Sequence, residues 1–424
     1  MTQRLPVGVQ DFQKIIRSDC YYVDKTRFIK SVMTEDSDVL LITRPRRFGK
    51  TLFMDTLARF LRFDEGRRNT TAAAPQELFA GLEIARDEAF CKEYMGQFPV
   101  VFFSLKSVYG DDFAEAYDNF AQEVLHVCEP YRYLLDSEKL TAVDKQYLQR
   151  FLNLDYLEDR SHKATAQKCL KVLVSCLSRH HERPVVLLID EYDVPLAKAA
   201  AKGYYDEMIG VIRPLLENGL KSDPDTDEAY LRKAVLTGCL RVGKESIFTG
   251  LNNPGINTVY SEDRTLSEAI GFSADEVRAM LAHYGLSDRF EDVRRWYDGY
   301  RFYRSDIYCP WDVVNFCSKA LASDDPRTYE PKNYWLGTSG NDVIAEFLNF
   351  LTDDDAERMQ TLVDGGTVEI TVNDKLNYND FAQHNSQDFW TLLLFTGYLT
   401  AVDPVSGRLD TYRVRIPNEG ILDA

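Results

Sequence analysis

Residues 39–51 read VLLITRPRRFGKT, and residues 52–61 continue as LFMDTLARFL. The apolar run from Val39 to Ile42 predicts a buried strand, and the second segment has the apolar spacing of a helix. A strand, a loop, Gly-Lys-Thr and a helix follow the order of a phosphate-binding loop, in which loop N–H groups and a helix N-terminus together attract anions. We therefore expect an anion-binding site between this strand and this helix.

Two residues of this stretch have specific expected roles. Lys50 would reach the β- and γ-phosphates of a nucleotide, and the hydroxyl of Thr51 would ligate Mg²⁺. The other expected nucleotide contacts are Arg44, Pro45, Arg46, Arg47, Phe48, Gly49 and Leu52. The generic motif has glycine where this chain has Arg44, and a Gly-Lys-Thr tripeptide also occurs by chance. An ordinary helix N-terminus is therefore the alternative for this stretch alone.

A second informative stretch is PVVLLIDEYD at residues 184–193, which predicts a buried strand ending in Asp190 and Glu191. In ATPases with a phosphate loop, a carboxylate at this point holds the Mg²⁺ shell, and an adjacent glutamate polarises the attacking water. Acidic residues are also common at strand ends without any function. Both stretches, however, end at the edge of a parallel sheet where ligands bind, so together they favour a nucleotide site with Asp190 at the metal and Glu191 as a catalytic residue.

A third strand is predicted at residues 233–238, which read KAVLTG. In ATPases of this kind, the strand beside the acidic one ends in a polar residue that contacts the γ-phosphate or water, and Thr237 occupies that place. Arg241 is a candidate reader of the γ-phosphate, although a surface arginine fits the sequence equally well.

Composition limits the kinds of protein that this chain can be. It has 424 residues, of which 45% are hydrophobic, so it can bury a sizeable core and form two or three domains. The formal net charge of −17 argues against a broad nucleic-acid surface but allows a local basic patch such as the arginines of the phosphate loop. The sequence has no apolar run long enough to cross a bilayer, and its first residues, MTQRLPVGVQDF, lack the apolar region of a signal peptide.

The cysteines and histidines indicate a cytoplasmic protein without a dedicated metal cluster. The eight cysteines have no CxxC pairing, and most have apolar neighbours, which favours reduced thiols in the core over disulfides. The six histidines are scattered. The pair His180-His181 follows a basic helical segment and is more typical of a solvated helix end than of a metal site.

The segment YYVDKTRFIKSVM, at residues 21–33, allows two interpretations. Either Tyr22 or Lys25 lies near the nucleotide, or the segment is a helix that covers the sheet and is capped by Asp24 or Thr26. The second interpretation needs no function and is the simpler one.

The order of segments predicts an α/β fold in three parts. Residues 1–262 would form a P-loop domain with a parallel sheet flanked by helices. Residues 263–330 would form a helical, lid-like region with a capping box at Ser273 to Glu276. Residues 331–424 would form a small α+β domain, with a winged-helix-like arrangement as one possibility.

Taken in order, the motifs resemble those of the bacterial AAA-ATPase-like family. The matching segments are YxVDKT, LITRPRRFGKT, LFAGLEI, LLIDEYD, LTG, FTGLNN, GFSADEV, WYDGYRF, YCPWDVVNF, NYWLGTSGN, LLLFTGYLT and RIPNE. The resemblance implies a P-loop ATPase that uses ATP and Mg²⁺, with RPRRFGKT as the family's own phosphate loop. It supports Lys50 and Thr51 at the phosphates and metal, and Asp190 and Glu191 at the metal and water.

Members of this family often continue into a PD-(D/E)XK nuclease-like domain. This chain stops at Ala424, and the only Glu-x-Lys in its last third is Glu330-Pro331-Lys332, with proline where a strand is needed. We find no nuclease site in the sequence, so we expect either a shortened chain or a naturally short member of the family.

The expected function is Mg²⁺-dependent ATP binding and hydrolysis coupled to a conformational change. The first alternative is a nucleotide-gated binding switch with little turnover, and the second is the ATPase module of a DNA-processing or defence system. A homo-oligomer, in which Arg46 or Arg47 could serve a neighbouring site, and a DNA or protein partner stay open. No membrane partner is indicated, and no motif distinguishes ATP from GTP.

Overall fold

The computed structural model describes residues 3–63, 73–221, 230–240, 254–261, 265–335, 351–373, 376 and 385–423. At its centre lies a parallel sheet of five strands in the order β2-β3-β4-β1-β5. The strands are β1 (Val39–Thr43), β2 (Val100–Ser104), β3 (Val185–Asp190), β4 (Leu231–Gly238) and β5 (Gly255–Asn257). The α/β fold with a parallel sheet is thereby confirmed.

The order of strands brings the predicted site residues to one edge of the sheet. β1 and β3 are buried along their whole length, as continuous apolar runs in parallel sheets are. β4 lies between them and pairs Thr237 with Ile42 on one side and Leu236 with Ile189 on the other. The carboxyl end of β3 is thus next to that of β4, which is next to the start of the phosphate loop.

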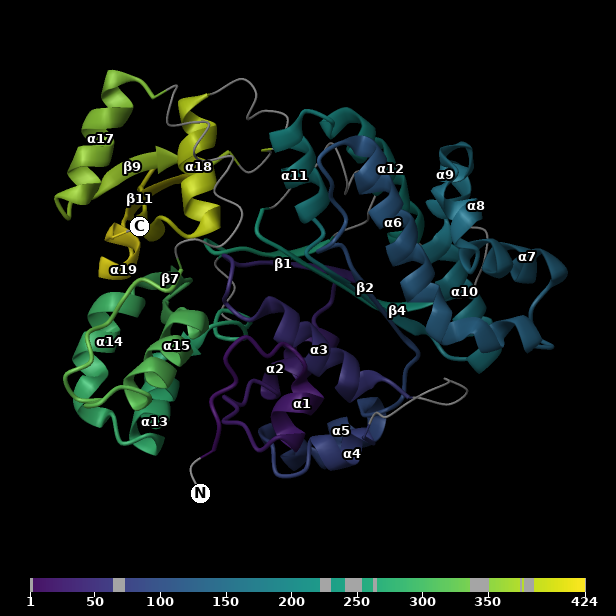
Figure 1. Cartoon of the computed structure of the whole chain (residues 1–424), viewed down its shortest axis with the longest axis horizontal. Helices are drawn as coiled ribbons and strands as arrows, with labels where there is room; N and C mark the ends of the chain where they lie inside the picture. The colour runs from purple at the N-terminus through teal and green to yellow at the C-terminus, as the bar shows by residue number, and fades with distance from the viewer. Residues whose placement is uncertain are drawn as a thin grey trace.

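Helices cover both faces of the sheet (Figure 1). One face carries α1 (Phe12–Arg17), α2 (Arg27–Thr34), α3 (Lys50–Leu61), α4 (Pro75–Leu78), η1 (Glu83–Arg86) and α5 (Glu88–Tyr94). The other carries α6 (Phe113–Cys128), α10 (Cys169–His181), α11 (Val194–Lys202) and α12 (Tyr205–Leu220). Outside α6 and α10 pack η2 (Glu129–Asp136), α7 (Ala142–Phe151), α8 (Leu154–Glu158), η3 (Arg160–His162) and α9 (Lys163–Ala166).

The region after the parallel sheet contains a helical unit with its own apolar cluster. Its elements are β6 (Phe272–Ser273), α13 (Ala274–His283), η4 (Ser287–Arg289), α14 (Phe290–Tyr297), β7 (Tyr300–Phe302), β8 (Ser305–Tyr308) and α15 (Pro310–Leu321). α13 begins at the predicted capping box, in which the Ser273 side chain and the Glu276 carboxylate each accept the other residue's backbone N–H. β7 and β8 pair as an antiparallel hairpin, and α15 begins with a proline, whose fixed φ suits the first turn of a helix.

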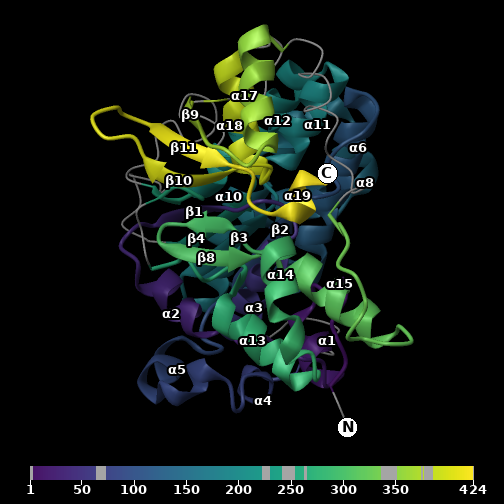
Figure 2. The same cartoon turned by 90° about the vertical axis from the view of Figure 1, so that its left-hand side faces the viewer.

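The last part of the chain is a small α+β unit. It contains α17 (Asp353–Val363), β9 (Val368–Thr371), α18 (Ser386–Thr396), β10 (Thr400–Pro404), β11 (Thr411–Arg415) and α19 (Glu419–Leu422). Its strands form an antiparallel sheet in the order β10-β11-β9, and a winged-helix arrangement is not confirmed. Figure 2 looks onto this side of the molecule, with the yellow antiparallel sheet above the green helices α13 to α15.

The structure also bears on the membrane and cysteine predictions. Within the described ranges, every helix is too short or too polar to cross a bilayer. All eight cysteines are free thiols, and six of them are buried, as expected of thiols in a core.

Candidate nucleotide-binding site

The phosphate loop and α3 place Lys50 at the carboxyl edge of the sheet. Gly49 precedes the helix with a φ of 97°, a left-handed conformation that glycine adopts without strain. Lys50 is 3% exposed, and its Nζ donates to the carbonyl oxygens of Arg44 and Pro45, each 3.2 Å away. The same ammonium lies 3.6 Å from Oε1 of Glu191. The loop therefore curls around the lysine side chain.

Asp190 is held by a hydroxyl group on each side. Oγ1 of Thr51 donates to its Oδ2 at 2.7 Å, and Oγ1 of Thr237 donates to its Oδ1 at 2.5 Å. Both Asp190 and Thr237 are fully buried. Burial raises the pKa of Asp190, the neighbouring Glu191 raises it further, and the two hydroxyl hydrogen bonds oppose this rise. The two hydroxyls thus orient the carboxylate towards the first turn of α3.

Glu191 follows directly, in an unusual backbone conformation. Its φ is 54°, in the left-handed region, which costs a non-glycine residue about 1–2 kcal/mol. The structure maintains this turn through Asp193, whose Oδ2 accepts the backbone N–H groups of Cys239 and Leu240 at 2.9 Å each. The loop after β3 is thereby tied to the end of β4, and the Glu191 side chain is left facing Lys50.

A cavity of about 530 Å³ lies at this edge. The seven residues from Arg46 to Leu52 all line it, together with Glu191. Four other predicted site residues are buried and do not line it: Arg44, Pro45, Asp190 and Thr237. Arg241, the candidate γ-phosphate reader, lies outside the described residues.

The cavity concentrates positive charge in a protein whose formal net charge is −17. Among the described residues, six basic side chains line it, against one carboxylate, that of Glu191. The basic residues are Lys25, Arg46, Arg47, Lys50, Lys106 and Lys198. This distribution suits a polyanionic ligand such as a triphosphate chain.

Sequence reasoning missed Lys106 and Lys198. Lys106 comes two residues after the end of β2, so the rule that ligands bind beyond the carboxyl ends of parallel strands could have found it. Lys198 lies within α11, and its spacing gives no signal in the sequence. Only the folded structure brings it to the cavity.

The three loop arginines have different surroundings. The side chain of Arg44 is fully buried and donates to Oδ1 of Asn257, away from the cavity. Arg47 lines the cavity, but its guanidinium lies 4.0 Å from the ring centre of Trp311. Arg46 lines the cavity as well. The loop therefore does not direct all of its arginines to one ligand.

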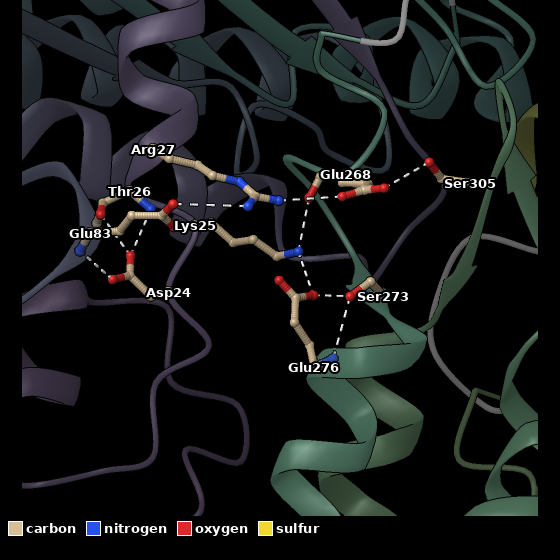
Figure 3. Close-up of polar contacts among 9 residues, drawn as sticks. All are labelled: Asp24, Lys25, Thr26, Arg27, Glu83, Glu268, Ser273, Glu276 and Ser305. Carbon is tan, nitrogen blue, oxygen red and sulfur yellow. Dashed lines mark hydrogen bonds and ion pairs between the residues drawn. The ribbon is translucent and has the colours of Figure 1, made fainter.

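Lys25 lines the cavity and also contacts the helical unit, and Figure 3 shows its ammonium group between Glu276 and Glu268. Its Nζ lies 2.6 Å from Oε2 of Glu276, in the first turn of α13, and 2.9 Å from the carbonyl oxygen of Glu268. Beside it, Arg27 pairs with the carboxylate of Glu268 at 3.3 Å. Both Lys25 and Tyr22 line the cavity, as the interpretation that places one of them near a nucleotide requires.

The expected capping of α2 is only partly correct. Thr26 is the N-cap residue, but its side chain makes no capping hydrogen bond. Its Oγ1 instead donates to Asp24 at 2.6 Å and accepts the N–H of Ile84 at 3.1 Å, while Asp24 also accepts the N–H of Glu83. Asp24 and Thr26 thus join the start of α2 to η1. Their side-chain oxygens accept N–H groups of η1 and not those of α2.

The residues around Thr51 fit Mg²⁺ by their chemistry. Magnesium prefers oxygen ligands, keeps several waters and is typically bound through one or two carboxylates and substrate phosphates. The Thr51 hydroxyl beside the Asp190 carboxylate offers such oxygens. The described part of the chain has no group of three or more His, Cys, Asp or Glu side chains that could hold a metal without such help.

A phosphate loop at the edge of a parallel sheet, with two carboxylates at the end of another strand of that sheet, is the arrangement of P-loop nucleotide-binding proteins. The family model described as predicted AAA-ATPase matches residues 6–248, so this chain belongs to that family. The resemblance noted from the motifs is thereby confirmed.

Two individual proteins are similar to this chain. An uncharacterized protein in the vnfD 5′ region of Azotobacter chroococcum mcd 1 is 29% identical over 349 residues, which make up 82% of this chain and 56% of that protein. This chain thus spans little more than half the length of that relative. A Walker-type ATPase of Pyrococcus abyssi aligns over 94% of this chain and 93% of its own, with 12% identity and a TM-score of 0.42.

Proposed function

We propose that this protein binds ATP with Mg²⁺ at the carboxyl edge of its parallel sheet and hydrolyses it, and that this cycle changes its conformation. The observation that carries the proposal is that Lys50, Thr51 and Glu191 line one cavity while Asp190 is bonded to Thr51. Membership of the predicted AAA-ATPase family supports the class of activity independently. The choice of ATP over GTP follows from the family alone.

Each residue has a role that follows from its position. The loop N–H groups and Lys50 would hold the β- and γ-phosphates, and Thr51 with Asp190 would hold Mg²⁺. When bound, this ion neutralises charge on the phosphate oxygens. Glu191 would orient and polarise the attacking water, and Thr237 would act indirectly by holding Asp190 in place.

Binding of the phosphates would also change the surroundings of Glu191. Lys50 lies 3.6 Å from Glu191, and a γ-phosphate would compete for the same ammonium group. The carboxylate would then lose an ion-pair partner and become free to contact water. Phosphate binding and activation of the glutamate are thereby linked through one lysine.

The same contact favours a second candidate function, a nucleotide-gated switch with little turnover. If Glu191 keeps its contact with Lys50 when nucleotide is bound, it holds the shape of the site and does not polarise water. The two functions differ in one measurable quantity, the rate of phosphate release at saturating ATP.

The test uses the purified chain, with ATP affinity measured by calorimetry and phosphate release measured with and without Mg²⁺. Lys50→Ala should lose binding, whereas Lys92→Ala, an exposed lysine on α5, should behave like wild type. Wild type that binds ATP without turnover, alone or with DNA, would favour the switch. Wild type that binds no nucleotide would refute both functions.

Three remaining predictions belong to this proposal. The division into residues 1–262, 263–330 and 331–424 should appear as preferred sites of limited proteolysis. A homo-oligomer should be visible by light scattering, with and without ATP. A cytoplasmic location should be found when the native protein is fractionated from its host cell.

A further inference from the structure

The phosphate loop contacts the cavity on its inner side and segments from the second half of the chain on its outer side. Lys50 lies at the cavity, whereas four side chains of the loop contact those segments, and two of the four, Arg47 and Phe48, line the cavity as well. These four are Arg44, Pro45, Arg47 and Phe48. In a generic phosphate loop the first of these positions is glycine, which has no side chain to make such a contact.

Arg44 makes the most buried of these contacts. Its Nη2 donates to Oδ1 of Asn257, on β5, at 2.6 Å and to the carbonyl oxygen of Leu266 at 3.0 Å. Its guanidinium carbon lies 4.8 Å from the ring centre of Phe302, on β7. The planar guanidinium thus joins the loop to the edge strand of the parallel sheet and to the hairpin of the helical unit, which an ammonium group could not do at once.

Arg47 and Phe48 extend the contact along the loop. Nη1 of Arg47 donates to the carbonyl oxygen of Tyr334 at 3.1 Å, and its guanidinium stacks on Trp311 of α15. Phe48 is 1% exposed and packs edge-on against Tyr300 of β7, with ring centres 4.8 Å apart. These are close, oriented contacts of the kind that fix side-chain geometry.

Two glycines on the facing segments leave the space that the loop occupies. Gly271 has a φ of 101°, and a Cβ there would lie 2.3 Å from Ile307 and 3.3 Å from Phe48. Gly397 has a φ of 94°, and a Cβ there would lie 2.9 Å from Pro45. A side chain at Gly397 would therefore collide with the loop itself, whereas one at Gly271 would collide with Ile307 of β8 and crowd Phe48.

We propose that Arg44 and Arg47 are positioning residues that tie the shape of the phosphate loop to the docking of residues 257–261 and 265–335. They would act on the nucleotide through the backbone of the loop. Because coupling between two sites is reciprocal, a ligand that orders the inner face of the loop also tightens the segments docked on its outer face. The ligand in this inference rests on the proposed function, but the positioning role does not.

The first test needs no nucleotide. Hydrogen exchange of residues 44–52 is measured in wild type, Arg44→Lys and Arg47→Ala. The matched control is Arg278→Ala, which removes an arginine stacked 4.2 Å from Phe290 within the helical unit. Exchange in the loop should quicken about tenfold or more in both test variants and stay unchanged in the control. Unchanged loop exchange in Arg47→Ala, whose side chain is only partly buried, would overturn the proposal.

The second test adds Mg²⁺ and a non-hydrolysable ATP analogue. In wild type, the analogue should slow exchange in residues 300–321 as well as in the loop. In Arg47→Ala it should slow exchange in the loop alone. If the bound analogue leaves exchange in residues 300–321 of wild type unchanged, the coupling is refuted. If wild type binds no nucleotide, the proposed function is refuted, and the first test alone decides whether the arginines are positioning residues.

Discussion

Two buried lysines line the same cavity, and their surroundings differ. Lys25 donates to two oxygens within 2.9 Å, and burial lowers its pKa because the attraction of Glu276 does not fully compensate. Lys50 is also buried, but Cys239, Glu191 and neighbouring carboxylates raise its pKa above the ordinary value. Its contact with Glu191 is loose, at 3.6 Å.

This difference gives Lys25 a structural role and leaves the charge of Lys50 available to a ligand. Lys25 has a close carboxylate and a carbonyl as partners, so its charge is satisfied within the protein. Lys50 is kept charged by several acidic neighbours, and it can exchange a loose contact for a phosphate. Substitutions around each lysine should therefore affect different quantities.

The largest expected effect is on nucleotide binding, in Lys50→Ala. This variant removes the ammonium between the loop carbonyls and Glu191, so ATP affinity should fall about 100-fold or more, the scale of ~2.7 kcal/mol. The fold should remain, as checked by circular dichroism. ATP affinity close to that of wild type would show that Lys50 does not contact phosphate.

The next largest effect is on turnover, in Glu191→Gln. Glutamine keeps the shape of the side chain but cannot take a proton, so single-turnover hydrolysis should slow by about 10²-fold while ATP binding survives or tightens. Asp190→Asn, in contrast, should also weaken Mg²⁺-dependent binding, because it disturbs the bond to Thr51. A wild-type rate of hydrolysis in Glu191→Gln would exclude Glu191 from the chemistry.

A smaller effect is expected for Thr51→Ala, which removes the hydroxyl beside Asp190. The concentration of Mg²⁺ needed for half-maximal ATP binding should rise about tenfold, whereas binding without the metal should change little. Thr34→Ala, at the end of α2, is a control with the same chemical change. Equal losses with and without Mg²⁺ would contradict the assignment of Thr51 to the metal.

The smallest effect on the nucleotide is expected for Lys25→Met, which should act on stability. Glu276 would lose its partner, so the free energy of unfolding should fall by about 1–3 kcal/mol, and ATP affinity should change less than in Lys50→Ala. Lys30→Met breaks an ion pair of the same length with Asp87 that is more exposed, so it should lower the free energy of unfolding less than Lys25→Met does. Denaturant unfolding of both variants measures this contrast. An equal loss of stability in Lys25→Met and Lys30→Met would show that Lys25 has no special structural role.

Much of the parallel sheet could be predicted from the sequence, for a physical reason. β1 and β3 are wholly buried and β2 and β4 largely so, and each therefore has an apolar run that distinguishes it from the flanking sequence. β5 could not be predicted, because Gly255, Ile256 and Asn257 have no strand pattern and pair only because β1 offers an edge.

The site was predictable in part. Asp190 and Glu191 follow a clear strand, and Lys50 and Thr51 begin the helix after the phosphate loop, so their spacing in the sequence assigns them. The spacing of residues along the sequence does not determine the direction of a side chain. The sequence therefore could not show that Arg44 points away from the cavity or that Lys198 points towards it. Both depend on packing between segments far apart in the chain.

The left-handed backbone of Glu191 lowers the stability of the protein at a residue that the proposed activity requires. Glycine at this position would relieve a strain of about 1–2 kcal/mol and would also remove the carboxylate that faces Lys50. A search for more stable variants would therefore tend to select against the proposed chemistry at this one position. An engineering programme that aims to stabilise this protein should keep residue 191 fixed and look elsewhere for its gains.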